Sequence, residues 1–286
     1  MKLTGPVLVA TDLSDGGDEA IRQADSMARQ LGGPLHVCHI LPEVLRVRML
    51  FPQLQQQDAS DMQALELKAS EAVAARVEAV TGRPRQDYAV STDTGSPHSG
   101  ILLQADRLRP GVLVLGAGRV ATRVVRYASC PVLVARPSPS GKVLGATDFS
   151  DPSLPAVEAA ASQAARRGVA LCLIHSIDLT FIQAGSTPMG VPVPAVPEQL
   201  RQEMKAEARK QLRACLERFA AQGECFVDDG PAAGAIVRAA RDLPAGLVVV
   251  GTRGRTGLTR LALGSVAESV LSDAPCSVLV IRLRED

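Results

Sequence analysis

Two nearly identical stretches, VLVATDLSD at residues 7–15 and VLGATDFSD at residues 143–151, constrain the fold of this chain more than any other feature. Similarity at a fixed spacing means that one structural unit has been built more than once. The correspondence continues at Gly32 with Gly168, His39 with His175, GVLVLG (111–116) with GLVVVG (246–251), and CPVLVAR (130–136) with CSVLVIR (276–282). The chain is therefore two copies of one unit.

The two copies differ most in one connection. The second copy has 24 residues between Gly251 and Cys276, whereas the first has 13 between Gly116 and Cys130, a difference of 11. Since the strands on both sides of this connection are kept, the extra residues form a loop that only the second copy has.

Each copy is long enough to be a domain, because roughly 140 residues is close to the commonest domain size. The stretch PSPSG at 137–141 is typical of a linker, so we expect one domain over 1–138 and a second over 139–286. Proline is also frequent over 188–197. That composition predicts a loop, either a plain surface excursion or a cover over some other part of the domain.

Strands and helices alternate in both copies. Short continuous apolar runs such as VLVA at 7–10 are typical of parallel strands that are covered on both faces. The first helix is expected to end at Gly32, and long helices are expected over 61–81 and 198–222. This alternation predicts right-handed crossovers and, in each domain, a doubly wound parallel sheet of the α/β class.

Composition argues against several classes of partner. The net charge is +1, which disfavours a nucleic-acid or polybasic membrane surface, and the absence of Trp with only two Tyr and five Phe disfavours base-stacking platforms for nucleic acid. No apolar run approaches the ~18 residues of a membrane span. Six Cys occur singly, which is typical of reduced, buried thiols in a cytoplasmic protein.

The loop that only the second copy has is rich in glycine. It reads GTRGRTGLTRLALGS over 251–265, follows a buried strand and precedes a helix. Glycines let backbone amides approach an anion, and the start of a helix carries free N–H groups and partial positive charge. Ser265 is expected to cap that helix, with Glu268 completing a capping box. The stretch is neither a Walker A loop nor a G-x-G-x-x-G fingerprint, so either a phosphate site or a simple turn fits it.

A carboxylate follows the first strand of the second copy. Ligands of open α/β sheets lie beyond the carboxyl ends of the strands, and Asp148 stands at such an end. It could accept hydrogen bonds from ribose hydroxyls or a base amino group. Alternatively, Asp148 or Ser150 only caps the next helix or starts an Asx turn. Ser150 is the better cap, which would leave Asp148 free.

These features together resemble the universal stress proteins (UspA-like), here as two domains over 2–138 and 141–285. The spacing Gly251-x2-Gly254-x9-Gly264-Ser265 is similar to that family's ATP-binding signature, and ATDFSD to its first strand and turn. The resemblance implies a five-stranded sheet of order 3-2-1-4-5, as in adenine-nucleotide α-hydrolases. It also implies cofactor-binding residues for ATP, with or without Mg²⁺: Ala146, Thr147 and Asp148 beside adenosine, Ser176 at the base, and Val250, Gly251, Arg253, Gly254, Gly264, Ser265 and Val266 around ribose and phosphates.

The first copy departs from this pattern. It keeps Ala10, Thr11 and Asp12, but where the second copy has the long glycine-rich loop it has only GAGRVATR at 116–123. Gly118-Arg119 stand where Gly264-Ser265 would be. We therefore expect the first domain to have lost ATP binding and to serve as a scaffold.

The sequence favours a nucleotide-dependent regulator or scaffold over an enzyme. No carboxylate pair stands near the glycine-rich loop to position water or metal for ATP hydrolysis, although Asp228 and Asp229 end a strand and could reach a metal. Slow ATPase activity, an ATP-using transferase or ligase, and a nucleotide-free scaffold remain open. A transferase of this type would need Ser-Gly-Gly-x-Asp-Ser where the chain has ATDLSD and ATDFSD. His36, Cys38 and His39 are more consistent with side chains that pack in the protein interior than with ligands of a zinc site.

The last strand of each copy is expected at the edge of its sheet. VLVAR (132–136) and VLVIR (278–282) are apolar and would be left unpaired. Universal stress proteins pair this strand across a two-fold axis. The resemblance therefore implies that the two strands pair within one chain as a pseudo-dimer, and it leaves a further homodimer open.

Overall fold

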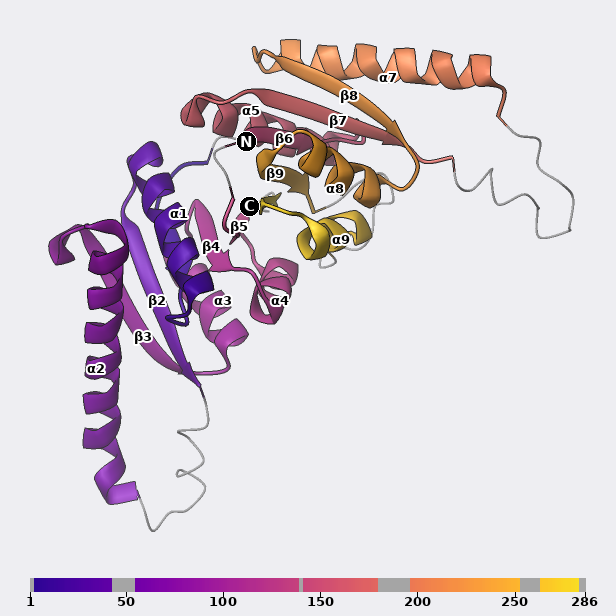
Figure 1. The fold of residues 1–286 in the computed structure, drawn as a ribbon. Helices are drawn as coiled ribbons and strands as arrows, with labels where there is room; N and C mark the ends of the chain where they lie inside the picture. Colours follow the sequence, from indigo (N-terminus) through magenta and orange to yellow (C-terminus); the bar gives the residue numbers. More distant parts are fainter. Residues whose placement is uncertain (1–2, 43–54, 139–140, 180–195, 253–262, 283–286) are drawn as a thin grey trace, which may run out of the picture. The chain divides into compact units, whose positions relative to one another are not determined.

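The computed structural model describes residues 3–42, 55–138, 141–179, 196–252 and 263–282. These fall into two compact units, formed chiefly by Leu3–Pro137 and Ser138–Ile281 (Figure 1). The division lies within the stretch that the sequence predicts as the linker. Among the described helices, none is both long and apolar enough to cross a bilayer.

The first unit is a parallel sheet with helical crossovers. Its strands lie in the order β3-β2-β1-β4-β5. In chain order its elements are β1 (Val7–Ala10), α1 (Asp15–Leu31), β2 (Leu35–Pro42), α2 (Gln55–Thr81), a 3-10 turn (Arg85–Asp87), β3 (Tyr88–Gly95), α3 (Pro97–Leu108), β4 (Val112–Gly116), α4 (Arg119–Tyr127) and β5 (Val132–Ala135).

The second unit repeats the arrangement, with strand order β10-β9-β6-β7-β8. Its elements are β6 (Lys142–Ala146), a 3-10 turn (Asp151–Ser153), α5 (Leu154–Arg167), β7 (Leu171–Ile177), α7 (Glu198–Arg218), β8 (Gly223–Asp229), α8 (Ala232–Asp242), β9 (Ala245–Gly251), α9 (Ser265–Asp273) and β10 (Ser277–Ile281). The predicted fold class, with sheets of order 3-2-1-4-5 in both halves, is confirmed.

Chain direction explains the layers. The crossovers through α1 and α2 run one way along the sheet, and those through α3 and α4 run the other way. Since such crossovers are right-handed, the two helix pairs cover opposite faces. The central strands are consequently buried on both sides: all four residues of β1 are buried, as are Leu35, Leu113 and Leu133.

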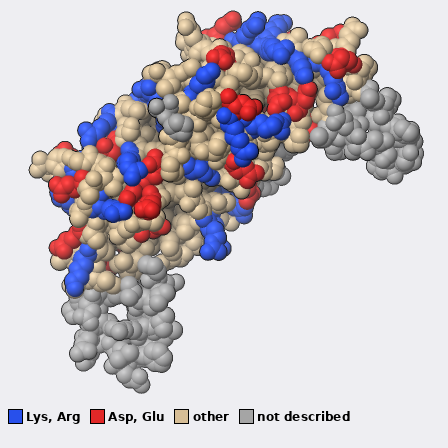
Figure 2. Space-filling model, viewed as in Figure 1, with Lys and Arg blue, Asp and Glu red and all other residues tan. Residues whose placement is uncertain are grey.

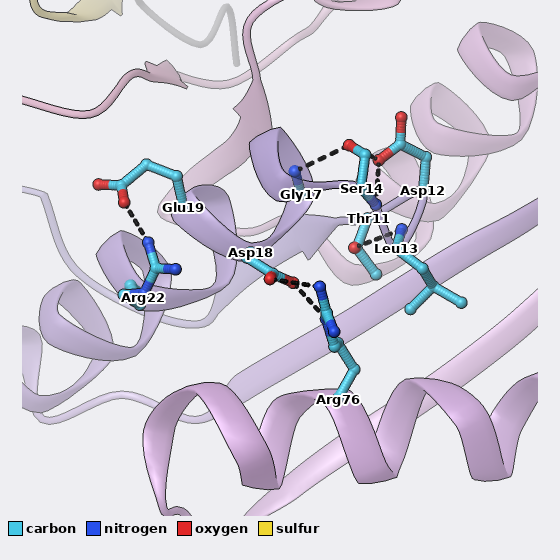
Figure 3. Close-up of polar contacts among 9 residues, drawn as sticks. All are labelled: Thr11, Asp12, Leu13, Ser14, Gly17, Asp18, Glu19, Arg22 and Arg76. Carbon is cyan, nitrogen blue, oxygen red and sulfur yellow. Dashed lines mark hydrogen bonds and ion pairs between the residues drawn. The ribbon is translucent and has the colours of Figure 1, made fainter.

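Ion pairs join the helices on one face of the first unit. The guanidinium of Arg76 in α2 donates from Nε and Nη2 to the two carboxylate oxygens of Asp18 in α1, over 2.7 and 2.6 Å (Figure 3). Asp25 of α1 likewise accepts from Arg83, just beyond α2, and from Arg29. The two-point geometry orients α2 on α1 more strictly than a single contact would.

Helix ends agree only in part with the sequence. Gly32 ends α1 with φ 64°, as predicted, and Gly168 ends α5 in the same way. Helix α2 begins at Gln55 rather than residue 61, and α7 ends at Arg218 rather than residue 222. The second difference has a local cause, because Ala220 has φ 48°, which helical backbone does not adopt.

The cysteine side chains are reduced and mostly buried. Burial raises the pKa of the Cys38 thiol to about 12, and burial also raises the pKa of Cys172, Cys215 and Cys225. Because the thiolate is the reactive form, we expect Cys38 to resist iodoacetamide at pH 8 in the folded protein and to react fully in denaturant. Peptide mass spectrometry would measure this, and rapid native labelling of Cys38 would contradict its burial.

Candidate nucleotide-binding site

The second unit contains a cavity of about 730 Å³ at the carboxyl ends of its strands. The ends of β6, β7 and β9 line it from the sheet, and the beginnings of α8 and α9 and one side of α7 complete the wall. Strand order reverses between β6 and β9, because the chain runs from β6 towards β8 on one side and from β9 to β10 on the other. This reversal is the place where open α/β sheets hold ligands.

Most residues that the sequence selects for this site lie around the same cavity. Nine of the eleven line it: Ala146, Thr147, Asp148, Ser176, Val250, Gly251, Gly264, Ser265 and Val266. The other two, Arg253 and Gly254, lie outside the described residues, as do Arg255 and Arg260. Residues separated by over a hundred positions in sequence are therefore brought to one hollow.

Asp148 is held in a tight turn. Its Oδ1 accepts from the backbone N–H of Ser150 at 3.1 Å and from the Ser150 hydroxyl at 2.6 Å. This is an Asx turn, so the expectation that Ser150 caps the helix and leaves Asp148 free is wrong. The Ser150 hydroxyl makes no capping bond, because the N–H of Ser153 donates to the Ser150 carbonyl in a 3-10 turn. The turn fixes the direction of a carboxylate that lines the cavity.

The start of α9 presents backbone amides to the cavity. Gly264 is the capping residue and Ser265 is the first helical residue, so the prediction that Ser265 caps the helix is wrong by one position. The first intrahelical bond runs from Glu268 N–H to the Gly264 carbonyl, 3.0 Å. The amides of Ser265, Val266 and Ala267 precede that bond and have no intrahelical acceptor. They lie at the positive end of the helix, which favours an anion.

Polar contacts also fix the opposite side of the cavity. Nδ1 of His175 donates to the Thr147 carbonyl at 2.9 Å and so joins the ends of β7 and β6. The Ser176 hydroxyl donates to the Gly230 carbonyl at 2.6 Å, which holds the chain just beyond β8. The backbone positions of β6, β7 and β8 are thereby tied together at the edge where a ligand would enter.

Sequence reasoning missed the part of the wall contributed by α7. Met204, Glu207, Ala208 and Gln211 line the cavity from that helix, and Gln211 Nε2 donates to Glu207 Oε1 at 3.2 Å. Their spacing places them on one helical face, a signal that the sequence contained. Phe149 also lines the cavity and was missed. The sequence signal was an aromatic residue in the second copy where the first copy has Leu13.

The first unit has the same turn after its first strand (Figure 3). Asp12 accepts from the backbone and hydroxyl of Ser14, and the Ser14 hydroxyl in turn accepts from Gly17 N–H at 3.2 Å. Burial raises the pKa of Asp12, but the bonds from Ser14 outweigh it and the net pKa lies below 3.8. The stability from this turn is therefore complete above pH ~4 and is lost as pH falls through the lowered pKa.

The two units differ in the first turn of the following helix. Helix α1 begins at Asp15, whereas α5 begins only after a 3-10 turn whose last residue, Ser153, lines the cavity. The Ser153 hydroxyl lies 2.8 Å from that of Thr147. Gly17 takes this position in the first unit, and a Cβ there would lie only 2.6 Å from Thr11 Oγ1. The first unit therefore has no room for the serine.

The units also differ before the last helix. Only Ala117 and Gly118 separate β4 from α4, whereas thirteen residues, 252–264, separate β9 from α9. Gly118 and Gly264 each stand directly before a helix of nine residues. This agrees with the match of Gly118-Arg119 to Gly264-Ser265 between the two copies. Their backbones differ, since Gly118 has φ 155° and Gly264 has φ −64°.

The acidic residues at the end of β8 have cationic partners. Asp228 accepts from Arg238 at 2.8 Å and Asp229 from Lys205 at 2.6 Å. Within the described part of the chain, no group of three or more His, Cys, Asp or Glu side chains could hold a metal ion. Figure 2 shows basic and acidic side chains intermixed on the visible face, without an extended field of one sign.

Comparison with known proteins identifies similar chains. The model of the "Universal stress protein family" matches residues 4–136 and again 140–282. A universal stress protein of Methanocaldococcus jannaschii is 34% identical over 144 residues, which cover 49% of this chain and 81% of the relative. A universal stress protein from Archaeoglobus fulgidus has the same fold, with a TM-score of 0.64 at 18% identity over 97% of this chain and 98% of the other. Another A. fulgidus universal stress protein was solved in complex with dAMP; it has a TM-score of 0.36 at 23% identity and covers 50% of this chain and 97% of its own.

Proposed function

The chain belongs to the universal stress protein family, and from that premise we propose that its second unit binds ATP and that the nucleotide regulates its conformation or its choice of partner. The observation that carries the proposal is the shared cavity, around which residues from β6, β7, β9 and α9 gather. Relatives in this family bind adenine nucleotides, as in the dAMP complex.

The described residues fit a nucleotide in size and in chemistry. A volume of about 730 Å³ lies within the usual range for small-molecule sites. The amides of Ser265 and Val266 would hold phosphate oxygens, and the Asp148 carboxylate would accept from ribose hydroxyls. Arg253, Gly254 and Mg²⁺ belong to the proposal too, although both residues lie outside the described part.

The expected affinity is sufficient for a cellular nucleotide. Hydrogen bonds to charged groups each contribute roughly 1.5–3 kcal/mol net, so three or four supply about 5–12 kcal/mol. Binding with a Kd near 1 μM requires about 8 kcal/mol. Before the cost of immobilising the ligand is counted, these bonds therefore bring the site into the range of micromolar binding.

The first unit is proposed to act as a scaffold without ATP. Its connection between β4 and α4 supplies only Ala117 and Gly118 where the second unit has the glycine-rich stretch.

Pairing of strand residues 132–136 with 278–282 within one chain remains our prediction. β5 and β10 are each the last strand in the sheet order of their own unit.

The test is the nucleotide content and binding stoichiometry of the whole protein. We expect native mass spectrometry to find adenine nucleotide carried through purification, and calorimetric titration of the emptied protein to give one ATP per chain. Two equivalent sites would contradict the assignment to the second unit. No binding at all would favour the nucleotide-free scaffold, and steady-state phosphate release would favour a slow ATPase.

A further inference from the structure

Phe149 is an aromatic side chain on the wall of the cavity in a chain that has few of them. It follows Asp148 directly and is half-buried, so part of its surface remains open to the cavity. Its ring contacts the imidazole of His175, with centroids 4.2 Å apart and planes inclined by 31°. The two rings together form an aromatic wall at one side of the hollow.

The backbone holds the Phe149 ring in a fixed place. Its φ of 65° lies in the left-handed region, which is uncommon for a bulky residue. The conformation is secured because Phe149 N–H donates to Thr147 Oγ1 at 3.0 Å. The ring also packs against the cluster of Ile177, Leu179 and Ala208. The His175 ring is oriented in turn by its bond to the Thr147 carbonyl, 2.9 Å.

The first unit offers an internal comparison at this position. Leu13 has φ 64°, and its N–H donates to Thr11 Oγ1 at 3.0 Å, so the turn is the same. His39 bonds to the Thr11 carbonyl at 2.7 Å, as His175 does to Thr147. The turn and the histidine therefore serve the fold in both units, and the aromatic ring is what the second unit adds.

We propose that Phe149 is the base-stacking residue of this cavity, against which the adenine ring of the nucleotide packs beside His175. This inference rests on the proposed function and names the residue that recognises the base. Asp148 and the start of α9 are suited to ribose and phosphate, which leaves the wall formed by Phe149 and α7 for the base. Every nucleobase has a π-face, so stacking contributes affinity without reading the base edge.

The test compares ATP with inorganic tripolyphosphate, which has no base. We expect F149L to weaken ATP binding by about 5- to 20-fold, because stacking on an aromatic ring is lost while an apolar side chain remains. Tripolyphosphate affinity should not change. Leucine is suited to the position because Leu13 has the same φ, and L13F is the matched control that should change neither affinity.

A second variant gives a direct readout of proximity. The chain has no Trp, so the indole introduced by F149W would be its only tryptophan. We expect ATP to quench that fluorescence and to bind at least as tightly as to the wild type, whereas tripolyphosphate should leave the emission unchanged.

The outcomes separate this inference from the proposed function. If the wild type binds no ATP, the proposed function fails and this inference fails with it. If the wild type binds ATP and F149L binds it equally well, or if ATP leaves the F149W emission unaltered, only the stacking role is overturned. An equal loss of ATP and tripolyphosphate affinity in F149L would also overturn it, because the base would then not be the group affected.

Discussion

Replacing Gly264 by valine is expected to lower the affinity for ATP by about 100-fold or more. Gly264 immediately precedes the amides of Ser265 and Val266, and the branched side chain would cover the approach of a phosphate to them. Losing two hydrogen bonds to a charged group costs about 3–6 kcal/mol, which corresponds to at least a hundredfold change in Kd. Isothermal titration of the full chain would measure it.

A smaller substitution, Gly264→Ala, separates a loss of ATP binding from a loss of folding. Gly264 has φ −64° and ψ 148°, so a side chain is compatible with its backbone. Its Cβ would lie 3.1 Å from the Thr252 carbonyl, a close contact that small shifts can relieve. We expect Gly264→Ala to lose less affinity than Gly264→Val, and both to keep the cooperative melting of the wild type. Full ATP affinity in a folded Gly264→Val protein would show that phosphate does not lie at α9.

The second large effect is expected from Asp148, and Asp12 in the equivalent turn of the first unit serves as its control. Asp148→Ala should weaken ATP binding by roughly 10- to 100-fold, because one or two charge-assisted hydrogen bonds to ribose are lost. Asp12→Ala removes the same Asx turn from the first unit and should leave ATP binding unchanged. Titration calorimetry of the two full-length variants measures the difference.

This pairing controls for the structural role of the carboxylate. Both aspartates accept from the serine two residues later, so both alanine variants lose comparable local bonds. Asp148→Asn keeps an oxygen acceptor for Ser150 and should retain the fold but not full affinity. Equal loss of ATP binding in Asp12→Ala and Asp148→Ala would instead place a nucleotide in both units.

Much of the fold could be predicted because its determinants are local or repeated. Runs such as VLVA at 7–10 require burial on both faces, and the repeat fixes the order of the elements twice. Of the cavity-lining residues at the ends of β6 and β9, only Asp148 was selected from its place at the carboxyl end of a strand, and the others were implied by the resemblance to universal stress proteins.

The remaining features depend on contacts that periodicity does not encode. Whether the serine of this turn caps a helix is decided by the backbone that follows it, because Gly17 N–H donates to the Ser14 hydroxyl whereas Ser153 N–H donates to the Ser150 carbonyl in a 3-10 turn. Helix α9 starts one residue earlier than the predicted cap at Ser265 allows, because Gly264 adopts the extended conformation of a capping residue. The spacing of Met204 and Gln211 shows that they share one helical face, but that this face lines the cavity depends on how α7 packs over β7.

The glycine at position 17 limits how nucleotide binding could be engineered into the first unit. Grafting residues 252–264 between β4 and α4 would restore the missing segment, but not the opposite wall. There the backbone of Gly17 already lies against Thr11, where a Cβ would come within 2.6 Å of the threonine hydroxyl oxygen. A working transplant would also need the opening turn of α1 rebuilt, so building a nucleotide site in the first unit takes two concerted changes rather than one insertion.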